Sequence, residues 1–404
     1  MAARERAQFA MLRVQLAHAK AHAPAFARSL AGIDPADIST RAALSRLPVL
    51  RKSELHSLQK QQRPFGGVAV AGWGAKGNAA RAARAFASPG PIYEPEGAGA
   101  DYWRLARALY AAGFRTGDLV HNCFSYHFTP AGSMLESGAL ALGCTVFPGG
   151  VGQTEQQVQA MSDLAPNGYV GTPSFFKIIL DKAGELGVGV GSVTKALFSG
   201  EAFTGSLRTF VAARGIDAYQ VYASADVGSI AYESSAHDGL IIDEGVLLEI
   251  VRPGTGDPVP PGEVGEVVVT LLGNQDYPLI RFATGDLSAT IPGVSACGRT
   301  NMRIKGWLGR ADQTTKVKGM FVHPSQVADI VRRHPGIERA RLVVDSPGGS
   351  DRMTLHVEAR DPVSADALVA SLREVTKLRG EIAIHEPGTL ANDGKVIDDQ
   401  RPID

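Results

Sequence analysis

The 404-residue sequence has few cysteines, no excess of either charge and no long apolar run. Cys123, Cys144 and Cys297 are widely spaced and odd in number, which argues against a disulfide framework and is typical of reduced thiols in a cytosol. The 41 basic and 41 acidic residues cancel, and no basic stretch stands out, so nothing favours a nucleic-acid partner. No apolar run reaches the ~18 residues of a membrane span, and the charged N-terminus does not resemble a signal peptide. We therefore expect a cytoplasmic protein with no membrane partner.

The middle of the chain alternates strand-like and helix-like segments. Strands are expected at 119–124, 144–147, 168–170, 196–198 and 218–222, and helices at 102–112, 130–142, 154–164, 174–186 and 203–214. Such alternation favours a mostly parallel sheet with helices on both faces.

Two regions with different sequence patterns follow. Beyond residue 228 the sequence is rich in strands and turns, which predicts a barrel or a small antiparallel sheet. Beyond Gly309 a compact α+β unit of about 90 residues is expected. The fold class is therefore α/β, with a large N-terminal domain of mostly parallel sheets plus a small barrel-like β part, and a small C-terminal α+β domain.

The segment from Tyr277 to Leu287 ends an apolar, strand-like run in Thr284-Gly285-Asp286. Gly285 permits a tight turn, and the carboxylate of Asp286 can accept both hydroxyl protons of a ribose. The alternative is that Gly-Asp simply ends a strand.

Four other segments carry residues suited to nucleotide chemistry, and each has a structural alternative. Phe198 to Phe203 joins a strand to a helix, and Glu201 could merely favour the helix start. Tyr222 precedes Asp226 by four residues and could be a core residue with a satisfied hydroxyl. Gly309 to Asp312 could be an exposed charged linker, and Lys395 after Gly394 could be a surface lysine.

The order of these motifs resembles the adenylate-forming enzymes, the acyl-CoA synthetase and luciferase superfamily. The residues within the motifs, together with the segment Leu47-Pro48-Val49-Leu50-Arg51-Lys52, are most similar to the phenylacetate–CoA ligase branch. The resemblance implies a ligase that activates a carboxylic acid, expected to be aromatic, with ATP and Mg²⁺ and transfers the acyl group to a thiol, expected to be CoA. It also implies a large domain at 1–308, a hinge at 309–312 and a mobile small domain at 313–404. A homodimer is possible.

The resemblance also implies individual roles. It assigns adenine contacts to Gly200, Glu201 and Tyr222, ribose contacts to Asp286 and Arg310, and a Mg²⁺ ligand to Asp226, where glutamate is usual. It assigns the hinge to Asp312, the thiol-stage site to Lys318 and Gly319, and adenylation to Lys395, whose ammonium would stabilise charge on the transferring oxygens.

Two departures limit the resemblance. The phosphate loop, expected to be rich in Ser and Thr with a lysine, is replaced by residues 88–95, which contain Ser88 and Gly90 but also three prolines, with Glu94 in place of the lysine. The alternative function is therefore a homologue that binds an aromatic acid, acyl-adenylate or nucleotide without ATP turnover. Two cysteines of a zinc site found in this branch are serines here, so no zinc is expected.

Overall fold

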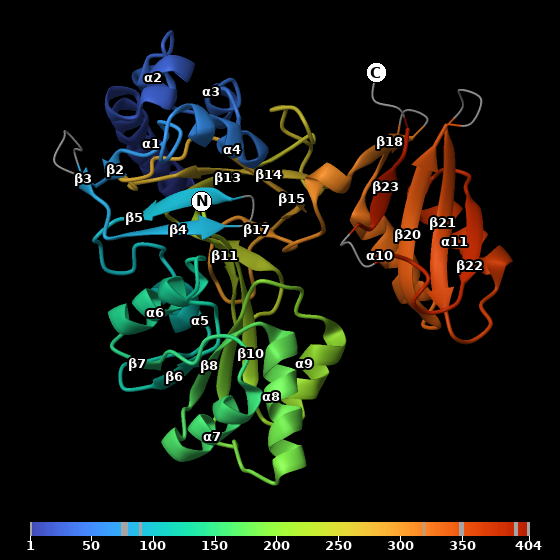
Figure 1. Cartoon of the computed structure of the whole chain (residues 1–404). Helices are drawn as coiled ribbons and strands as arrows, with labels where there is room; N and C mark the ends of the chain where they lie inside the picture. The colour runs from blue at the N-terminus through green and yellow to red at the C-terminus, as the bar shows by residue number, and fades with distance from the viewer. Residues whose placement is uncertain are drawn as a thin grey trace. The chain divides into compact units, whose positions relative to one another are not determined.

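The computed structural model describes residues 2–73, 80–88, 91–317, 320–346, 351–391 and 395–401. The chain forms two compact units, each described by itself. Unit 1 comprises Met1–Thr284 and Ala289–Trp307, and unit 2 comprises Gly285–Ser288 and Leu308–Asp404. Figure 1 shows the elements of both units. The expected division at 309–312 and the role of this segment as a hinge stay predictions.

Unit 1 contains a nine-stranded sheet in the order β16-β17-β12-β11-β10-β9-β8-β6-β7. Its parallel part consists of β6 (Leu119–Asn122), β7 (Thr145–Phe147), β8 (Gly168–Gly171), β9 (Lys195–Phe198) and β10 (Asp217–Ser224). The helices between them are α6 (Ala131–Ala141), α7 (Thr154–Leu164), α8 (Pro173–Leu186) and α9 (Gly205–Ala212), and α5 (Ala106–Ala111) precedes them. The expected α/β class is confirmed.

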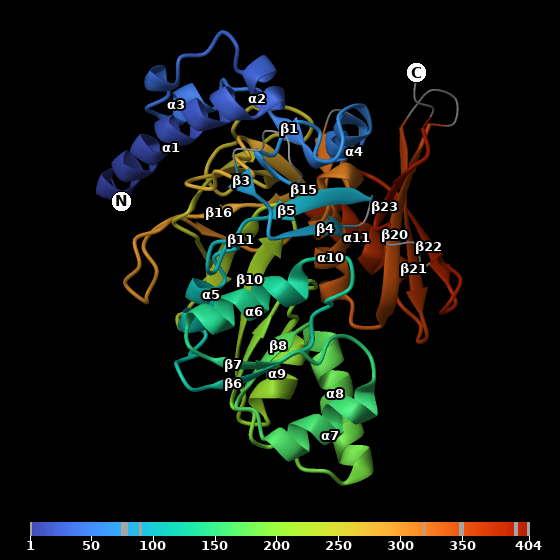
Figure 2. The same ribbon diagram turned by 60° about the vertical axis from the view of Figure 1, so that its left-hand side comes forward.

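The side chains of these parallel strands alternate between two hydrophobic cores. Val170 and Leu197 pack in the core under α5 and α6, whereas Tyr169 and Phe198 pack in the core under α7 and α8. Figure 2 accordingly shows α5 and α6 apart from α7, α8 and α9. The alternation follows from the two-residue period of a strand.

The sheet changes direction after β10. The strands β11 (Gly228–Glu233), β12 (Leu240–Ile242), β17 (Arg303–Ile304) and β16 (Thr290–Ile291) continue it in antiparallel pairing. The turn from β10 to β11 carries Asp226.

A second sheet of four strands has the order β1-β15-β14-β13. It consists of β1 (Leu50–Arg51), β13 (Val246–Val251), β14 (Gly265–Leu271) and β15 (Phe282–Ser288). A barrel or a small antiparallel sheet was expected here, and the described strands form an open sheet and not a closed barrel, because β1 and β13 lie at opposite edges and do not pair.

The N-terminal region of unit 1 adds α1 (Ala2–His22), α2 (Pro24–Ser29), α3 (Arg41–Leu44) and α4 (Lys52–Gln61), with a 3₁₀ turn at Pro35–Asp37. Phe9, Leu12 and Leu16 of α1 share a core with Leu248 of β13. Two short strands, β2 (Ala71–Gly72) and β3 (Ala80–Arg81), pair in parallel. The strands β4 (Arg84–Ser88) and β5 (Ile92–Glu96) pair in antiparallel fashion, so Ser88 lies opposite Ile92.

Unit 2 is built on the sheet β22-β21-β20-β23. Its elements are β18 (Thr315–Val317), β19 (Met320–Val322), α10 (Pro324–Arg333), β20 (Ile337–Asp345), β21 (Arg352–Ala359), α11 (Ala365–Thr376), β22 (Glu381–His385) and β23 (Ile397–Asp399), after a 3₁₀ turn at Ala311–Gln313. Leu342, Leu355 and Leu368 are fully buried in its core. In the part of the chain described above, no helix of either unit is long and apolar enough to span a bilayer.

Candidate functional site

The turn between β10 and β11 holds Asp226 in the interior of unit 1. Its side chain is buried, and its Oδ2 atom accepts a hydrogen bond from Nζ of Lys52 at 2.6 Å. Its Oδ1 atom has no hydrogen-bond partner among the described residues. Gly228 has φ +78°, and a Cβ there would lie 2.6 Å from the carbonyl oxygen of Trp103, so the turn requires glycine at this position.

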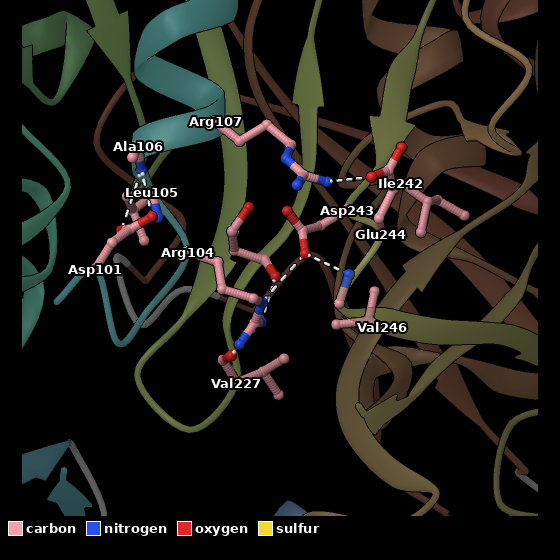
Figure 3. Close-up of polar contacts among 12 residues, drawn as sticks. Asp101, Arg104, Leu105, Ala106, Arg107, Val227, Ile242, Asp243, Glu244 and Val246 are labelled. Atoms are coloured by element: carbon pink, nitrogen blue, oxygen red, sulfur yellow. Dashed lines mark hydrogen bonds and ion pairs between the residues drawn. The ribbon is translucent and has the colours of Figure 1, made fainter. Parts of the chain in front are cut away.

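Arg104 fixes the backbone on either side of Gly228 (Figure 3). Its Nη2 atom donates to the carbonyls of Val227 at 2.8 Å and Ser229 at 2.9 Å, and its Nε donates to Oδ1 of Asp243 at 3.1 Å. The guanidinium can serve all three acceptors because its donors form a rigid planar fork. No local pattern singles out Arg104 or Lys52, because their most distant partners lie 139 and 174 positions away along the chain.

Glu94 lies in the interior close to Asp226 rather than at a solvent-exposed loop. Its carboxyl accepts a hydrogen bond from the backbone N–H of Ser88 at 3.2 Å and another from the Ser88 hydroxyl. Burial and the neighbouring Asp226 carboxylate raise the pKa of Glu94 to about 8, against the opposing effects of Ser88 and Lys52. Burial and the Asp226 carboxylate thus both favour the neutral carboxylic acid form of Glu94, whereas the sequence analysis treated Glu94 as an anion.

Replacing Glu94 with glutamine should flatten the pH dependence of stability. Because the pKa of about 8 exceeds the unfolded value of 4.5, the folded state binds more protons between these values, and the free energy of unfolding falls as pH rises. The shift corresponds to an upper bound of about 4–5 kcal/mol at pH 8. We expect Glu94→Gln to match the wild type in urea unfolding at pH 5 and to exceed it at pH 8. The exposed Glu263→Gln serves as the control, and parallel curves for wild type and Glu94→Gln would contradict a buried, protonated Glu94.

The residues expected to contact adenine lie beside the parallel strands. Gly200 follows β9 with φ +84°, and a Cβ there would be 3.5 Å or more from its neighbours, so the backbone conformation rather than crowding favours glycine. Oε1 of Glu201 accepts a 2.6 Å hydrogen bond from the backbone N–H of Ser174, in the first turn of α8. The hydroxyl of Tyr222 lies 3.3 Å from Oγ1 of Thr284, and its ring is part of the buried core.

The residues expected to contact ribose meet within unit 2. Asp286 and Arg310 face each other in an isolated β-bridge, and Nη1 of Arg310 donates to Oδ1 of Asp286 at 3.2 Å. Nε of Arg310 donates to Oδ1 of Asp312 at 3.3 Å. Burial lowers the pKa of Arg310, but the two carboxylates outweigh it and raise the pKa above its ordinary value. The side chain of Asp312 is 67% exposed, whereas that of Asp286 is 15% exposed.

Lys395 lies near the end of unit 2. Its Nζ donates to Oδ1 of Asp398 at 2.9 Å, and its side chain is 53% exposed. This hydrogen bond lowers the pKa of Asp398. The next residue, Val396, donates its backbone N–H to Oε1 of Gln313 at 2.8 Å, which ties the segment to the 3₁₀ turn that contains Asp312.

The predicted residues thus form separate groups within the two units. In unit 1, Ser88 hydrogen-bonds to Glu94 and Asp226 interacts with it electrostatically. In unit 2, Asp286, Arg310 and Asp312 form one network. The predicted residues Gly90, Lys318 and Gly319 lie outside the described residues. The roles proposed for all of them stay predictions.

The serines that replace two expected zinc ligands lie next to the remaining cysteine. Oγ of Ser295 donates to Sγ of Cys297 at 3.1 Å, and Nη1 of Arg299 donates to it at 3.6 Å. Burial raises the pKa of Cys297, but hydrogen bonds from Ser234, Ser295 and Arg299 outweigh it and lower the pKa to about 6. Among the described residues, no group of three or more His, Cys, Asp or Glu side chains lies together in a way that could hold a metal ion.

Cys297 should be the first cysteine to react with alkylating reagents. The thiolate is the reactive form, and Cys297 is largely ionised at pH 7, whereas burial raises the pKa of Cys123 to about 12. We expect iodoacetamide at pH 7 to label one site, which peptide mass spectrometry assigns to Cys297 and which Cys297→Ser removes. The labelling rate should rise with a midpoint near pH 6, and a midpoint near 9 would refute the stabilised thiolate. Arg299→Gln should move the midpoint upward.

Comparisons with known proteins place the chain in a family. Residues 100–273 match the family model for AMP-binding enzymes. The chain is 30% identical to a phenylacetate–coenzyme A ligase of Aromatoleum evansii, and the match covers 98% of this chain and 94% of that protein. It is also 30% identical to a phenylacetate–coenzyme A ligase of Thermus thermophilus, with 87% and 82% covered.

The fold is shared with a solved acyl-CoA ligase. The crystal structure of an open conformation of 2-hydroxyisobutyryl-CoA ligase in complex with 2-HIB-AMP and CoA superimposes with a TM-score of 0.81. The match has 22% sequence identity and covers 97% of this chain and 91% of that one. Fold and sequence therefore define an adenylate-forming enzyme.

Within that class, the identity to the relatives from Aromatoleum and Thermus decides the branch. The chain belongs to the phenylacetate–CoA ligase-like branch of the adenylate-forming superfamily.

Proposed function

We propose that this enzyme activates a carboxylic acid with ATP and transfers the acyl group to coenzyme A. The acid carboxylate attacks the α-phosphorus of ATP, which gives an acyl-adenylate and releases pyrophosphate. The CoA thiol then attacks the acyl carbonyl and displaces AMP. The observation that carries the proposal is the identity to phenylacetate–CoA ligases along 98% of the chain. Because of the names of these relatives, we propose an aromatic acid as the substrate.

Individual residues would take the following parts in this reaction. In unit 1, the backbone at Gly200 and Glu201 and the ring of Tyr222 would receive adenine. In unit 2, Asp286 would accept the ribose hydroxyl protons, Arg310 would approach ribose or phosphate, and Lys395 would neutralise charge during adenylation. Asp312 would act as the hinge, and Lys318 and Gly319 would serve the thioester step.

The proposed Mg²⁺ site centres on Asp226. Its Oδ1 has no partner among the described residues, and a single carboxylate oxygen suits Mg²⁺, which keeps water and phosphate ligands. When bound, Mg²⁺ would neutralise charge on the phosphates. Lys52 would hold the Asp226 carboxylate through its hydrogen bond, and Arg104 would hold the turn that carries Asp226 through the backbone carbonyl of Val227. A cytoplasmic location and a homodimer stay predictions.

One observation favours the second candidate function, which is binding of an acyl-adenylate, aromatic acid or nucleotide without ATP turnover. In the usual phosphate loop, backbone N–H groups and hydroxyls face the β- and γ-phosphates. Here both the N–H and the hydroxyl of Ser88 donate to Glu94 instead. The described part of the loop therefore offers a triphosphate fewer donors than its sequence position suggests.

The two candidates differ in pyrophosphate release. The wild-type protein is mixed with ATP, Mg²⁺ and CoA across a panel of aromatic and aliphatic acids, and pyrophosphate and acyl-CoA are measured. Calorimetry with AMP and ATP is run in parallel. Acid-dependent pyrophosphate release establishes the ligase. Tight AMP binding without release for any acid favours the second candidate, and failure to bind either nucleotide rejects both.

A further inference from the structure

Unit 1 contains a cavity of about 670 Å³ that none of the proposed reaction steps uses. Residues of the helices α1 and α3 and of the strands β13 and β16 line it. Its volume falls within the ~300–1,000 Å³ of pockets that bind small molecules. Gly200, Tyr222 and Asp226 are absent from its lining, so it is separate from the proposed adenine and metal positions.

The walls of this cavity are mainly apolar. Val246, Leu248 and Ile250 of β13 line it together with Ile242 and Ile291. Three prolines of the loop before β14, namely Pro258, Pro260 and Pro261, also line it. Burial of apolar ligand surface against such walls contributes roughly 25 cal/mol per Å².

The charged side chains in the lining already have partners. Arg41 forms an ion pair with Glu5 at 2.6 Å and donates to the carbonyl of Leu248 at 2.9 Å. Arg4 donates to Thr300 at 2.9 Å and lies 3.6 Å from Glu244.

The two acids on the opposite side are also paired. Glu249 accepts from Arg281 at 2.9 Å, and Asp243 accepts from Arg104 at 3.1 Å. Every charged lining residue therefore has an ion-pair partner in unit 1. The lining therefore offers a ligand no uncompensated charge, and desolvation of an ionic ligand against its apolar walls would be unfavourable.

We propose that this cavity is a binding site for a neutral, largely apolar small molecule, distinct from the acid and nucleotide of the proposed reaction. The uncharged polar side chains of Ser45, Gln8 and Asn301 line it. Their donors bond to backbone carbonyls, but their oxygens can accept hydrogen bonds from a hydroxyl or amide of such a molecule. A free carboxylic acid, which the proposed reaction consumes, is disfavoured here because it is anionic at neutral pH.

A matched pair of fluorescent probes tests the chemistry of the site. N-phenyl-1-naphthylamine is neutral, and 1-anilinonaphthalene-8-sulfonate has the same rings with an added sulfonate. We expect the neutral probe to bind the wild-type protein with one saturable site and at least about tenfold more tightly than the anionic probe, which corresponds to about 1.4 kcal/mol. Equal affinity of the two probes for the site would overturn the preference for a neutral ligand.

Two substitutions locate the bound probe. Ala42 lines the cavity on α3 and is exposed, so Ala42→Trp should fill the cavity from its rim and weaken the neutral probe at least tenfold. Ala370→Trp, at an exposed position of α11 in unit 2, is the matched control and should leave binding unchanged. If Ala42→Trp fails to fold by circular dichroism, Ser45→Phe replaces it. Unchanged binding in a folded cavity variant would overturn the proposal. No nucleotide is present, so this outcome is independent of the ligase assay.

Discussion

Lys395→Ala is expected to slow acyl-adenylate formation by about 10²–10³-fold, the range for removal of one preorganised charge-stabilising group. The ammonium is proposed to face the carboxylate and the α-phosphate, where negative charge concentrates during adenylation. A compact charge that is already in position needs little reorganisation as the reaction proceeds. Stability should change little, because the ion pair with Asp398 is partly exposed and such pairs contribute about 0–1 kcal/mol.

The second half-reaction separates a specific role from general damage. Thioester formation from supplied acyl-adenylate and CoA should stay within a few-fold of wild type in Lys395→Ala, because adenylation is the step assigned to Lys395. Asp398→Asn is the matched control: it removes the partner of Lys395 but keeps the ammonium, so adenylation should persist. Equal loss of both half-reactions in Lys395→Ala would rule out a step-specific role.

Asp286→Ala is expected to weaken AMP binding by about 10²–10⁴-fold. Two charge-assisted hydrogen bonds to ribose would be lost, each worth roughly 1.5–3 kcal/mol. The local fold should persist, because Arg310 keeps its contact with Asp312 and the backbone bridge between positions 286 and 310 does not need the carboxylate.

Calorimetry with AMP measures this effect directly. Asp312→Ala provides the comparison, since it also removes an acidic partner of Arg310 but from the exposed side. Its AMP affinity should stay within a few-fold of wild type, whereas the overall rate should fall if the residue acts as the hinge. If Asp286→Ala folds normally and binds AMP as the wild type does, the ribose assignment is incorrect.

The alternating part of the fold was predictable because its signal is local. The helix at 154–164 begins and ends at the expected residues, since apolar spacing and flanking turn residues mark it. The parallel strands followed from short apolar segments between the helices. The helix from Lys52 to Gln61 was missed because its apolar positions are few and its polar side chains dominate.

The environment of Glu94 could not be predicted in the same way. Its protonation depends on Asp226, 132 positions later, and on Lys52, 42 positions earlier, which the sequence does not place together. Similarly, a sheet forms a closed barrel only if its two edge strands pair with each other, and the local sequence pattern of a strand does not determine this pairing. The candidate site residues were identified because their motifs occur along the chain in the order typical of the family. Lys52 and Arg104, which support Asp226 and its turn, were not singled out by any motif.

The packing of Glu94 constrains how this family member could have diverged. The buried space around it holds two carboxyl groups and one ammonium group, and a lysine at position 94 would reverse that balance to two ammonium groups and one carboxylate. Replacement of Glu94 by the lysine of the usual phosphate loop would leave an unpaired charge in this buried space. A lysine at position 94 is thus expected to be tolerated only with a further change that compensates the added charge.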